Sequence, residues 1–113
     1  MKTLADLKRN LHNCEFKLFE NSWYKQLPEF QAQWRKVGKV NSVGFTLLTD
    51  KQGNGEYSHS HIDYPKASEI QLIQLNEEKT HFTLIIKRDC YTKHQVTVEH
   101  IMIYEIKLHN NEA

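Results

Sequence analysis

The first stretch of the chain has the spacing of a short amphipathic helix. Leu4, Leu7 and Leu11 recur at positions i, i+3 and i+7, which places their side chains on one helix face. Thr3 is followed three residues later by an aspartate, the spacing of a capping box at a helix N-terminus. We therefore expect one capped helix over about residues 3–12, with its leucine stripe buried.

After this helix the apolar residues change to the two-residue period of β-strands. Cys14, Phe16 and Leu18 alternate with charged residues, as in a strand with one buried face. The glycines of residues 50–55 predict a tight turn, and Pro65 predicts a corner because proline cannot donate to a sheet ladder. The first strand is expected to begin at Cys14. Two more are expected within residues 31–49, joined near Asn41 and Ser42. The remaining strands are expected over about residues 56–64, 69–75, 81–88 and 95–108.

Two of these segments carry finer expectations about which side chains are buried. The side on which apolar residues fall shifts between Trp34 and Val37, which predicts a β-bulge. In this segment the expected apolar contacts come from Trp34, Val37, Val40, Val43, Phe45 and Leu47. In the last strand the residues expected on one face are Val96, Val98, Met102, Tyr104, Ile106 and Leu108.

One helix followed by about seven antiparallel strands defines an α+β domain. Successive hairpins predict a strongly twisted or barrel-like antiparallel sheet, with the helix packed on it and closing one opening. The length of 113 residues matches a single domain, so we assign residues 1–113 to one folding unit. Exposed strand edges leave both a monomer and a homodimer open.

Composition excludes several classes of protein. Hydrophobic residues make up 39% of the chain and charged residues 26%, which is typical of a globular domain and not of a disordered one. Lys and Arg number 15 and Asp and Glu number 14, so the chain lacks the strong positive charge of a dedicated nucleic-acid binder. The sequence shows neither a signal peptide nor an apolar run long enough to span a membrane, so we expect a cytoplasmic protein.

The segment SHSHIDYPKAS, residues 58–68, carries two of the seven histidines in the chain. In a strand, residues i and i+2 point the same way, so His59, His61 and Asp63 should project from one face. Two imidazoles placed in this way can converge on one zinc ion. In the cytoplasm the two cysteines of the chain suit core packing or metal ligation better than a disulfide.

The order of the strands adds further candidate ligands. If every connection is a hairpin, the strand carrying His61 ends at the same end of the sheet as the loop with Cys90 and His94. By the same argument His12 and Cys14 lie at that end, with the histidines at positions 81 and 109 at the other. The preferred ligands of a structural Zn²⁺ site are His59, His61, Cys90 and His94. Cys14 is the first substitute for one of these ligands, and His12 is another.

The alternative interpretation of this segment needs no metal. The two cysteines would then be packed or loop residues, and His59 a partly exposed strand residue. His100 lies on the apolar face of the last strand, where we expect a core histidine with a hydrogen-bond partner. His81 and His109 are expected at the surface.

The sequence does not predict an enzyme. Neither cysteine has the surroundings of a catalytic nucleophile, and the glycines match neither a dinucleotide-binding loop nor a P-loop. A metal-dependent hydrolase would need an open coordination position, which the sequence cannot show.

Two kinds of binding surface are visible instead. Basic and aromatic residues interleave in WRKVGK, residues 34–39, and Lys87, Arg88 and Lys93 add positive charge, so a small nucleic-acid-binding module is the alternative function. The loop aromatics that could anchor a protein partner are Trp23, Tyr24, Tyr57 and Tyr91.

Three segments, TLADLKRNL, WRKVGKVNSVGFTL and SHIDYPKAS, resemble small proteins of phages and mobile elements of Gram-positive bacteria. The resemblance covers roughly residues 3–75 and centres on the pattern Ser, aromatic, aliphatic, acid, aromatic, Pro-Lys-Ala-Ser. His61 stands where those relatives carry an aromatic residue, so a metal ligand at this position would belong to this chain and not to the family.

In length, expected fold and His/Cys content the chain looks like a type II-A anti-CRISPR protein of a streptococcal prophage. This resemblance implies an inhibitor that binds an RNA-guided effector nuclease of the host and blocks the loading or cleavage of target DNA. It implies no catalytic residue.

Overall fold

The computed structural model describes residues 1–27, 32–51, 57–91, 94 and 96–109, with the backbone alone at residues 49–51 and 57–60. Within these residues the elements are α1 (Leu4–Asn10), η1 (Leu11–Asn13), β1 (Cys14–Asn21), β2 (Arg35–Val40), β3 (Gly44–Lys51), β4 (Tyr57–Asp63), η3 (Ala67–Glu69), β5 (Ile70–Gln74), β6 (His81–Tyr91) and β7 (Thr97–Leu108). The predicted α+β fold, with one N-terminal helix and about seven antiparallel strands, is confirmed.

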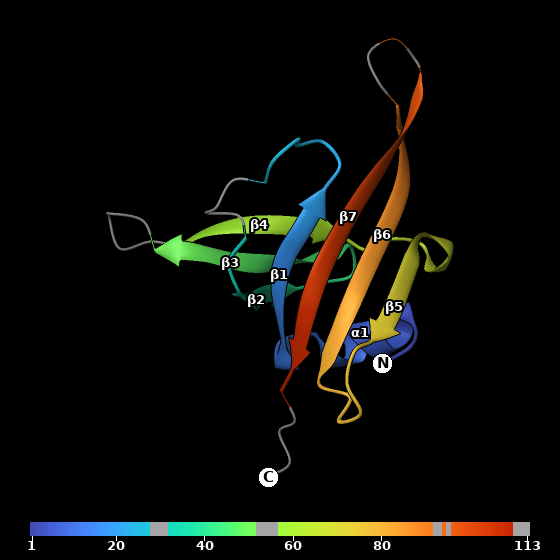
Figure 1. Ribbon diagram of the computed structural model, residues 1–113. Coiled ribbons are helices and arrows are strands. Elements are labelled where there is room, and N and C mark those ends of the chain that lie inside the picture. The colour runs from blue at the N-terminus through green and yellow to red at the C-terminus, as the bar shows by residue number, and fades with distance from the viewer. Residues whose placement is uncertain (28–31, 52–56, 92–93, 95, 110–113) are drawn as a thin grey trace.

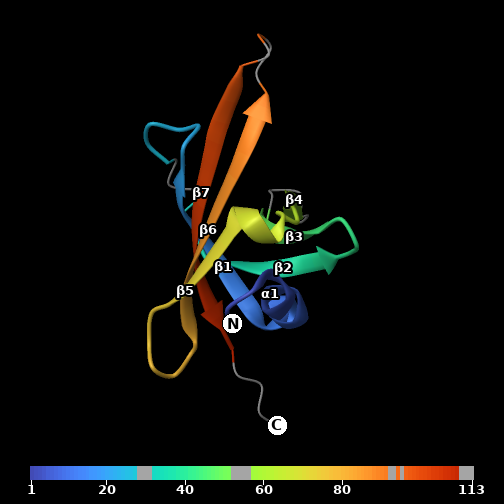
Figure 2. The ribbon, with the colours of Figure 1, turned by 90° about the vertical axis from the view of Figure 1, so that its right-hand side faces the viewer.

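The described strands form one antiparallel sheet in the order β4-β3-β2-β1-β7-β6-β5. β1 pairs with both β2 and β7, so the first and the last of these strands are neighbours. The sheet stays open, with β4 and β5 at its two ends, and it twists so strongly that β3 and β4 cross behind β1 and β7 (Figure 1). α1 lies below this crossing (Figure 2).

The core fills the space between the two crossed parts of the sheet. Phe16 of β1 is fully buried, and its ring centroid lies 5.3 Å from that of Phe45 in β3 and 6.0 Å from that of Tyr104 in β7. Leu7 and Leu11 of the predicted helix stripe are buried against the same cluster. The other buried apolar residues are Cys14, Leu47, Ile62, Phe82, Leu84, Ile86 and Ile106.

The helix begins as predicted. The hydroxyl of Thr3 accepts a hydrogen bond from the backbone N–H of Asp6, and the carboxylate of Asp6 accepts one from the N–H of Thr3, each at 3.2 Å. This reciprocal pair is a capping box. α1 ends at Asn10, and the chain turns into β1 through the 3-10 turn η1.

The β2–β3 hairpin corrects two details of the prediction. The side chain of Asn41 accepts hydrogen bonds from the N–H groups of Val43 (2.9 Å) and Gly44 (3.0 Å), which closes the expected turn. The register shifts between Val37 and Val40, so the bulge comes later than predicted. Val40 is exposed because it follows this shift in register, and Val43 is exposed because it stands in the turn. The turn predicted at residues 50–55 falls largely outside the described residues.

β6 and β7 run on past their neighbours as a two-stranded ribbon (Figure 1). β5 pairs with β6 only as far as Ile86, and β1 pairs with β7 only as far as Met102. We call residues 87–91 and 97–101 the distal ribbon. Val96 and Val98 were predicted to share one face with the buried residues of the last strand, but they are 56% and 41% exposed because this ribbon extends beyond the rest of the sheet (Figure 1).

Arg88 links the two parts of the sheet across the opening between β4 and β6. Its Nη2 donates a hydrogen bond to the backbone carbonyl oxygen of Asp63, at the end of β4. The Nε of the same guanidinium is buried and has no hydrogen-bond partner among the described residues. Arg88 therefore connects β4 to β6 at the cost of one unpaired buried donor.

The turn between β5 and β6 contains a residue in an unfavourable backbone conformation. Lys79 has a φ angle of 60°, in the left-handed region that glycine adopts without steric cost. Lys79→Gly is therefore expected to increase the free energy of unfolding, measured by urea denaturation, by about 0.5–1 kcal/mol. This is the net gain: relief of the unfavourable backbone exceeds the cost of the greater conformational entropy of glycine in the unfolded chain. Lys79→Ala removes the same side chain but keeps a Cβ, and an equal gain from it would contradict the backbone explanation.

Candidate functional site

Two of the residues singled out on β4, His61 and Asp63, lie on its outer face. Ile62 between them is buried and pairs with Phe45, so His61 and Asp63 project away from the core. The Nε2 of His61 lies 2.8 Å from a carboxylate oxygen of Asp63, and both side chains are exposed. His61 and Asp63 share a face as predicted, while the side chain of His59 lies outside the described residues.

The other two predicted ligands lie on or beyond the distal ribbon. Cys90 pairs with Val98, is half-buried, and shares the core-side face of β6 with Ile86 four residues earlier. His94 is exposed in the connection between β6 and β7. Among the side chains that the structure describes, no three His, Cys, Asp or Glu residues gather as metal ligands. The zinc site therefore stays a prediction.

The proposed substitutes, His12 and Cys14, lie at the opposite end from Cys90, so this part of the prediction is wrong. Cys14 pairs with Leu108 and Cys90 with Val98, ten residues apart on β7, which is about 33 Å at the rise of a strand. The parity argument assumed that strands adjacent in the sequence pair, whereas β4 and β5 lie at opposite edges of the sheet and β1 pairs with β7.

Cys14 is packed in the core. It is 2% exposed, and burial raises the pKa of its thiol to about 12. Without a metal the thiol therefore stays protonated, as expected of a packed cysteine.

A second group of residues forms a rigid turn after β1. The side-chain oxygen of Asn21 accepts hydrogen bonds from the N–H of Trp23 (3.1 Å) and from Nε2 of His100 (2.8 Å). The rings of Trp23 and His100 are stacked, with centroids 3.7 Å apart and an interplanar angle of 11°. The N–H of Tyr24 donates to the carbonyl of Asn21, and Ser22 exchanges hydrogen bonds with Ile101 of β7. The turn is thus tied to β7 at several points.

Trp23 is nevertheless 63% exposed, because only one face of its ring rests on His100. His100 itself is 7% exposed, which confirms the prediction of a core histidine with a hydrogen-bond partner. Since Asn21 presents an oxygen that two donors share, Nε2 of His100 carries the hydrogen. Tyr24 is exposed beside this stack.

The burial of His100 makes the stability of the fold sensitive to pH. Burial, and secondly the nearby charge of Arg88, lower the pKa of His100 below its ordinary value of 6.5. As the pH falls, the unfolded chain therefore binds the proton first, so stability is complete above about pH 6.5 and is lost below it. We expect the urea midpoint to fall between about pH 7 and 5.5, and to fall less in His100→Gln. An equal fall in both proteins would contradict this assignment.

The outer face of the distal ribbon carries two acids opposite one another. Asp89 pairs with Glu99 across the two strands, and both are exposed. No described residue forms an ion pair with either of them. Like charges directly opposite in a sheet are destabilising, so this pair does not serve the stability of the ribbon. Tyr91, which is 81% exposed, follows on the same face.

We call the exposed residues at this end of the molecule the docking end, and they comprise Trp23, Tyr24, Asp89, Tyr91, Val96, Val98 and Glu99. The loop position of its aromatics was predicted from the sequence, although the side chain of Tyr57 lies outside the described residues. The acid pair and the two valines were missed. Their position follows from the length of β6, which continues to Tyr91 and not only to residue 88 as the sequence predicted.

The basic residues of the alternative function do not form one patch. The ring of Trp34 lies 4.0 Å from the ammonium of Lys107 and 5.9 Å from that of Lys17. Lys87 pairs with Ile101, six residues from Lys107 on β7, or about 20 Å. Arg88 is engaged with Asp63, and Lys93 lies outside the described residues.

Comparisons with known proteins found no relative of this chain. The chain matches no protein-family model, no curated protein and no solved structure. Within the described part of the chain, no helix is long and apolar enough to cross a membrane. The fold and the site thus define a small α+β protein with a rigid, exposed aromatic end.

Proposed function

We propose that this chain is a binding protein without catalytic activity. It inhibits a bacterial defence system by attaching its docking end to a type II CRISPR effector nuclease in the host cytoplasm. The bound protein prevents the nuclease from loading or cleaving target DNA. The observation that carries the proposal is the exposed Trp23, held on the buried His100 by stacking and by a shared hydrogen-bond acceptor.

A tryptophan held in this way is suited to protein binding. Tryptophan and tyrosine are enriched among the residues that dominate binding energy in interfaces. Association also costs side-chain entropy, and a ring already fixed in the free protein loses less of it. Trp23 and Tyr24 therefore supply large contact areas on a turn that needs little further ordering.

The acids of the distal ribbon support the choice of partner. RNA-guided nucleases hold the guide–target duplex in a positively charged channel. Asp89 and Glu99, which form no ion pair with a described residue, present negative charge beside the exposed ring of Tyr91, and this complements such a surface. The assignment to a CRISPR nuclease in particular rests on the sequence resemblance to phage proteins.

The test combines purified protein with a type II-A effector nuclease and its guide RNA. We expect a complex on gel filtration and reduced cleavage of target DNA. Trp23→Ala should weaken the complex by about 30-fold or more, since truncation of a dominant interface residue costs about 2 kcal/mol. Leu75→Ala, at an exposed residue next to the β5–β6 turn, is the control and should bind normally.

Two results would overturn the proposal. Absence of a complex together with unhindered cleavage would remove the inhibitor function. Binding to nucleic acid alone, weakening steeply with salt, would favour the nucleic-acid-binding module instead.

The structural Zn²⁺ is a separate proposal for the set His59, His61, Cys90 and His94. The described members of this set do not gather around a common point, so the proposal rests on the sequence spacing alone. Elemental analysis of the purified protein tests it directly. About one equivalent of zinc per chain supports it, and protein free of zinc overturns it.

A further inference from the structure

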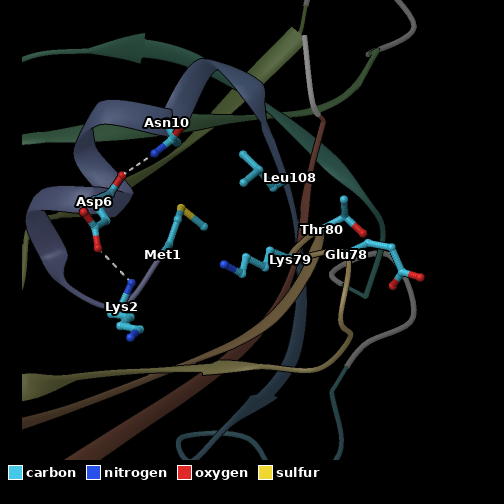
Figure 3. Close-up of a pocket in the computed structure, with 8 residues that line it drawn as sticks. All are labelled: Met1, Lys2, Asp6, Asn10, Glu78, Lys79, Thr80 and Leu108. Carbon is cyan, nitrogen blue, oxygen red and sulfur yellow. Dashed lines mark hydrogen bonds between the residues drawn. The ribbon is translucent and has the colours of Figure 1, made fainter. Parts of the chain in front are cut away.

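A groove lies between the N-terminal turn of α1 and the turn that joins β5 to β6 (Figure 3). Its volume is about 470 Å³, and it is open on one side. Met1 and Leu108 supply apolar surface, while Lys2 and Lys79 supply positive charge. In Figure 3 the side chain of Lys79 extends across the groove toward Met1. Leu108 lies at the other end of β7 from the distal ribbon, so this groove is independent of the docking end.

The acids near the groove do not neutralise these lysines. The carboxylate of Asp6 accepts hydrogen bonds from the backbone N–H groups of Lys2 (2.9 Å) and Thr3 (3.2 Å), and another from the guanidinium of Arg9. Its backbone hydrogen bonds, more than any other cause, lower the pKa of this carboxyl group. Asp6 is thus already engaged within the helix cap, where the backbone donors of α1 are also used.

Glu78, the other acid, turns its carboxylate away from the groove in Figure 3. No described residue forms an ion pair with the ammonium groups of Lys2 or Lys79. Lys79 thus places a positive charge next to apolar surface, with the carboxylate of Asp6 paired to Arg9 and that of Glu78 turned away.

Lys79 stands in the turn between β5 and β6 with a φ angle of 60°, a left-handed conformation found in turns. From this turn its side chain extends over the groove.

We propose that this groove binds a small organic oxyanion. Lys79 and Lys2 bind the phosphate or carboxylate group, and a short apolar body covers Met1 and Leu108. Both anions offer the oxygen acceptors that ammonium groups bind, so the groove alone does not choose between them.

The test uses two-dimensional NMR of the full chain during titration with phenyl phosphate, benzoate, inorganic phosphate and benzyl alcohol. We expect phenyl phosphate or benzoate to half-saturate at about 1 mM or below, with the largest shifts at Lys79, Thr80 and Leu108. The tighter of the two identifies the anion. Inorganic phosphate should bind more weakly, and benzyl alcohol should not bind.

Variants separate this site from non-specific attraction. Lys79→Gly removes the ammonium without forcing an unfavourable backbone, and it should weaken binding at least fivefold while the protein stays folded. Lys87→Gln removes the same charge from the distal ribbon and should leave binding unchanged. The proposal is overturned if no ligand shifts these signals at about 10 mM, if the shifts lie on the distal ribbon, or if Lys79→Gly binds as well as the parent.

Discussion

Phe16→Ala is expected to lower the free energy of unfolding by about 3–5 kcal/mol, a large part of the total stability of a domain of this size. Phe16 is fully buried and contacts Phe45 and Tyr104, which belong to the two crossed parts of the sheet. Truncation removes its apolar surface and leaves a cavity that strands held by backbone hydrogen bonds cannot close. Urea denaturation followed by circular dichroism measures the change.

Phe19→Ala is the matched control for this prediction. Phe19 stands three residues later on β1, at a shift in the register with β7, and is 63% exposed. The same truncation there should change stability by less than about 0.5 kcal/mol. If the two variants lost similar stability, the side of β1 that faces the core would be assigned incorrectly.

Gly44→Ala should cost about 3 kcal/mol, because the new Cβ would meet backbone and not side chain. A Cβ at this position would lie 2.1 Å from the carbonyl oxygen of Ile62 and 3.0 Å from the Cα of Asp63. These atoms belong to β4, which pairs with Gly44 and cannot move without breaking its hydrogen bonds to β3. Moving β4 would also disturb the contact between Asp63 and Arg88.

Gly38→Ala provides the comparison, since the only change is again one methyl group. Its Cβ would lie 2.7 Å from the hydroxyl of Thr46 and 3.0 Å from a methyl of Leu48, both side-chain ends that can rotate. Rotation of Thr46 sacrifices its hydrogen bond from the N–H of Lys39, so we expect a loss of about 1 kcal/mol. Equal losses in the two variants, measured in the same denaturation series, would refute the close approach of β3 and β4.

Local features of the fold were accessible from the sequence because they depend on neighbours in the chain. The capping box at Thr3 and the Asn41 turn follow from short-range hydrogen bonds, and the Pro65 corner follows from the missing N–H donor of proline. The pairing of β1 with β7 was not accessible, because a two-residue period states which face is buried and not which strand lies beside it. Because this pairing was not known from the sequence, Cys14 was predicted at the same end of the sheet as Cys90, whereas it lies at the opposite end.

The candidate sites likewise fall into those that the sequence indicated and those that only the structure shows. Trp23 and Tyr91 were singled out as possible anchors from their positions in or near loops, and both are exposed, although Tyr91 is the last residue of β6. The Asp89–Glu99 pair requires the register between β6 and β7, and the groove around Lys79 combines residues from three distant segments. Neither arrangement leaves a pattern along the chain, so only the three-dimensional structure shows them.

The position of β1 between β2 and β7 also has a consequence for how the chain reaches this structure. Cys14 pairs with Leu108, so a central ladder of the sheet joins segments more than ninety residues apart. Contacts of such long range slow folding, because the entropy of closing the loop is lost before the contacts form. During synthesis, β1 must therefore wait with one edge unpaired until residues 97–108 have left the ribosome, and the fold is completed only after translation of its last strand.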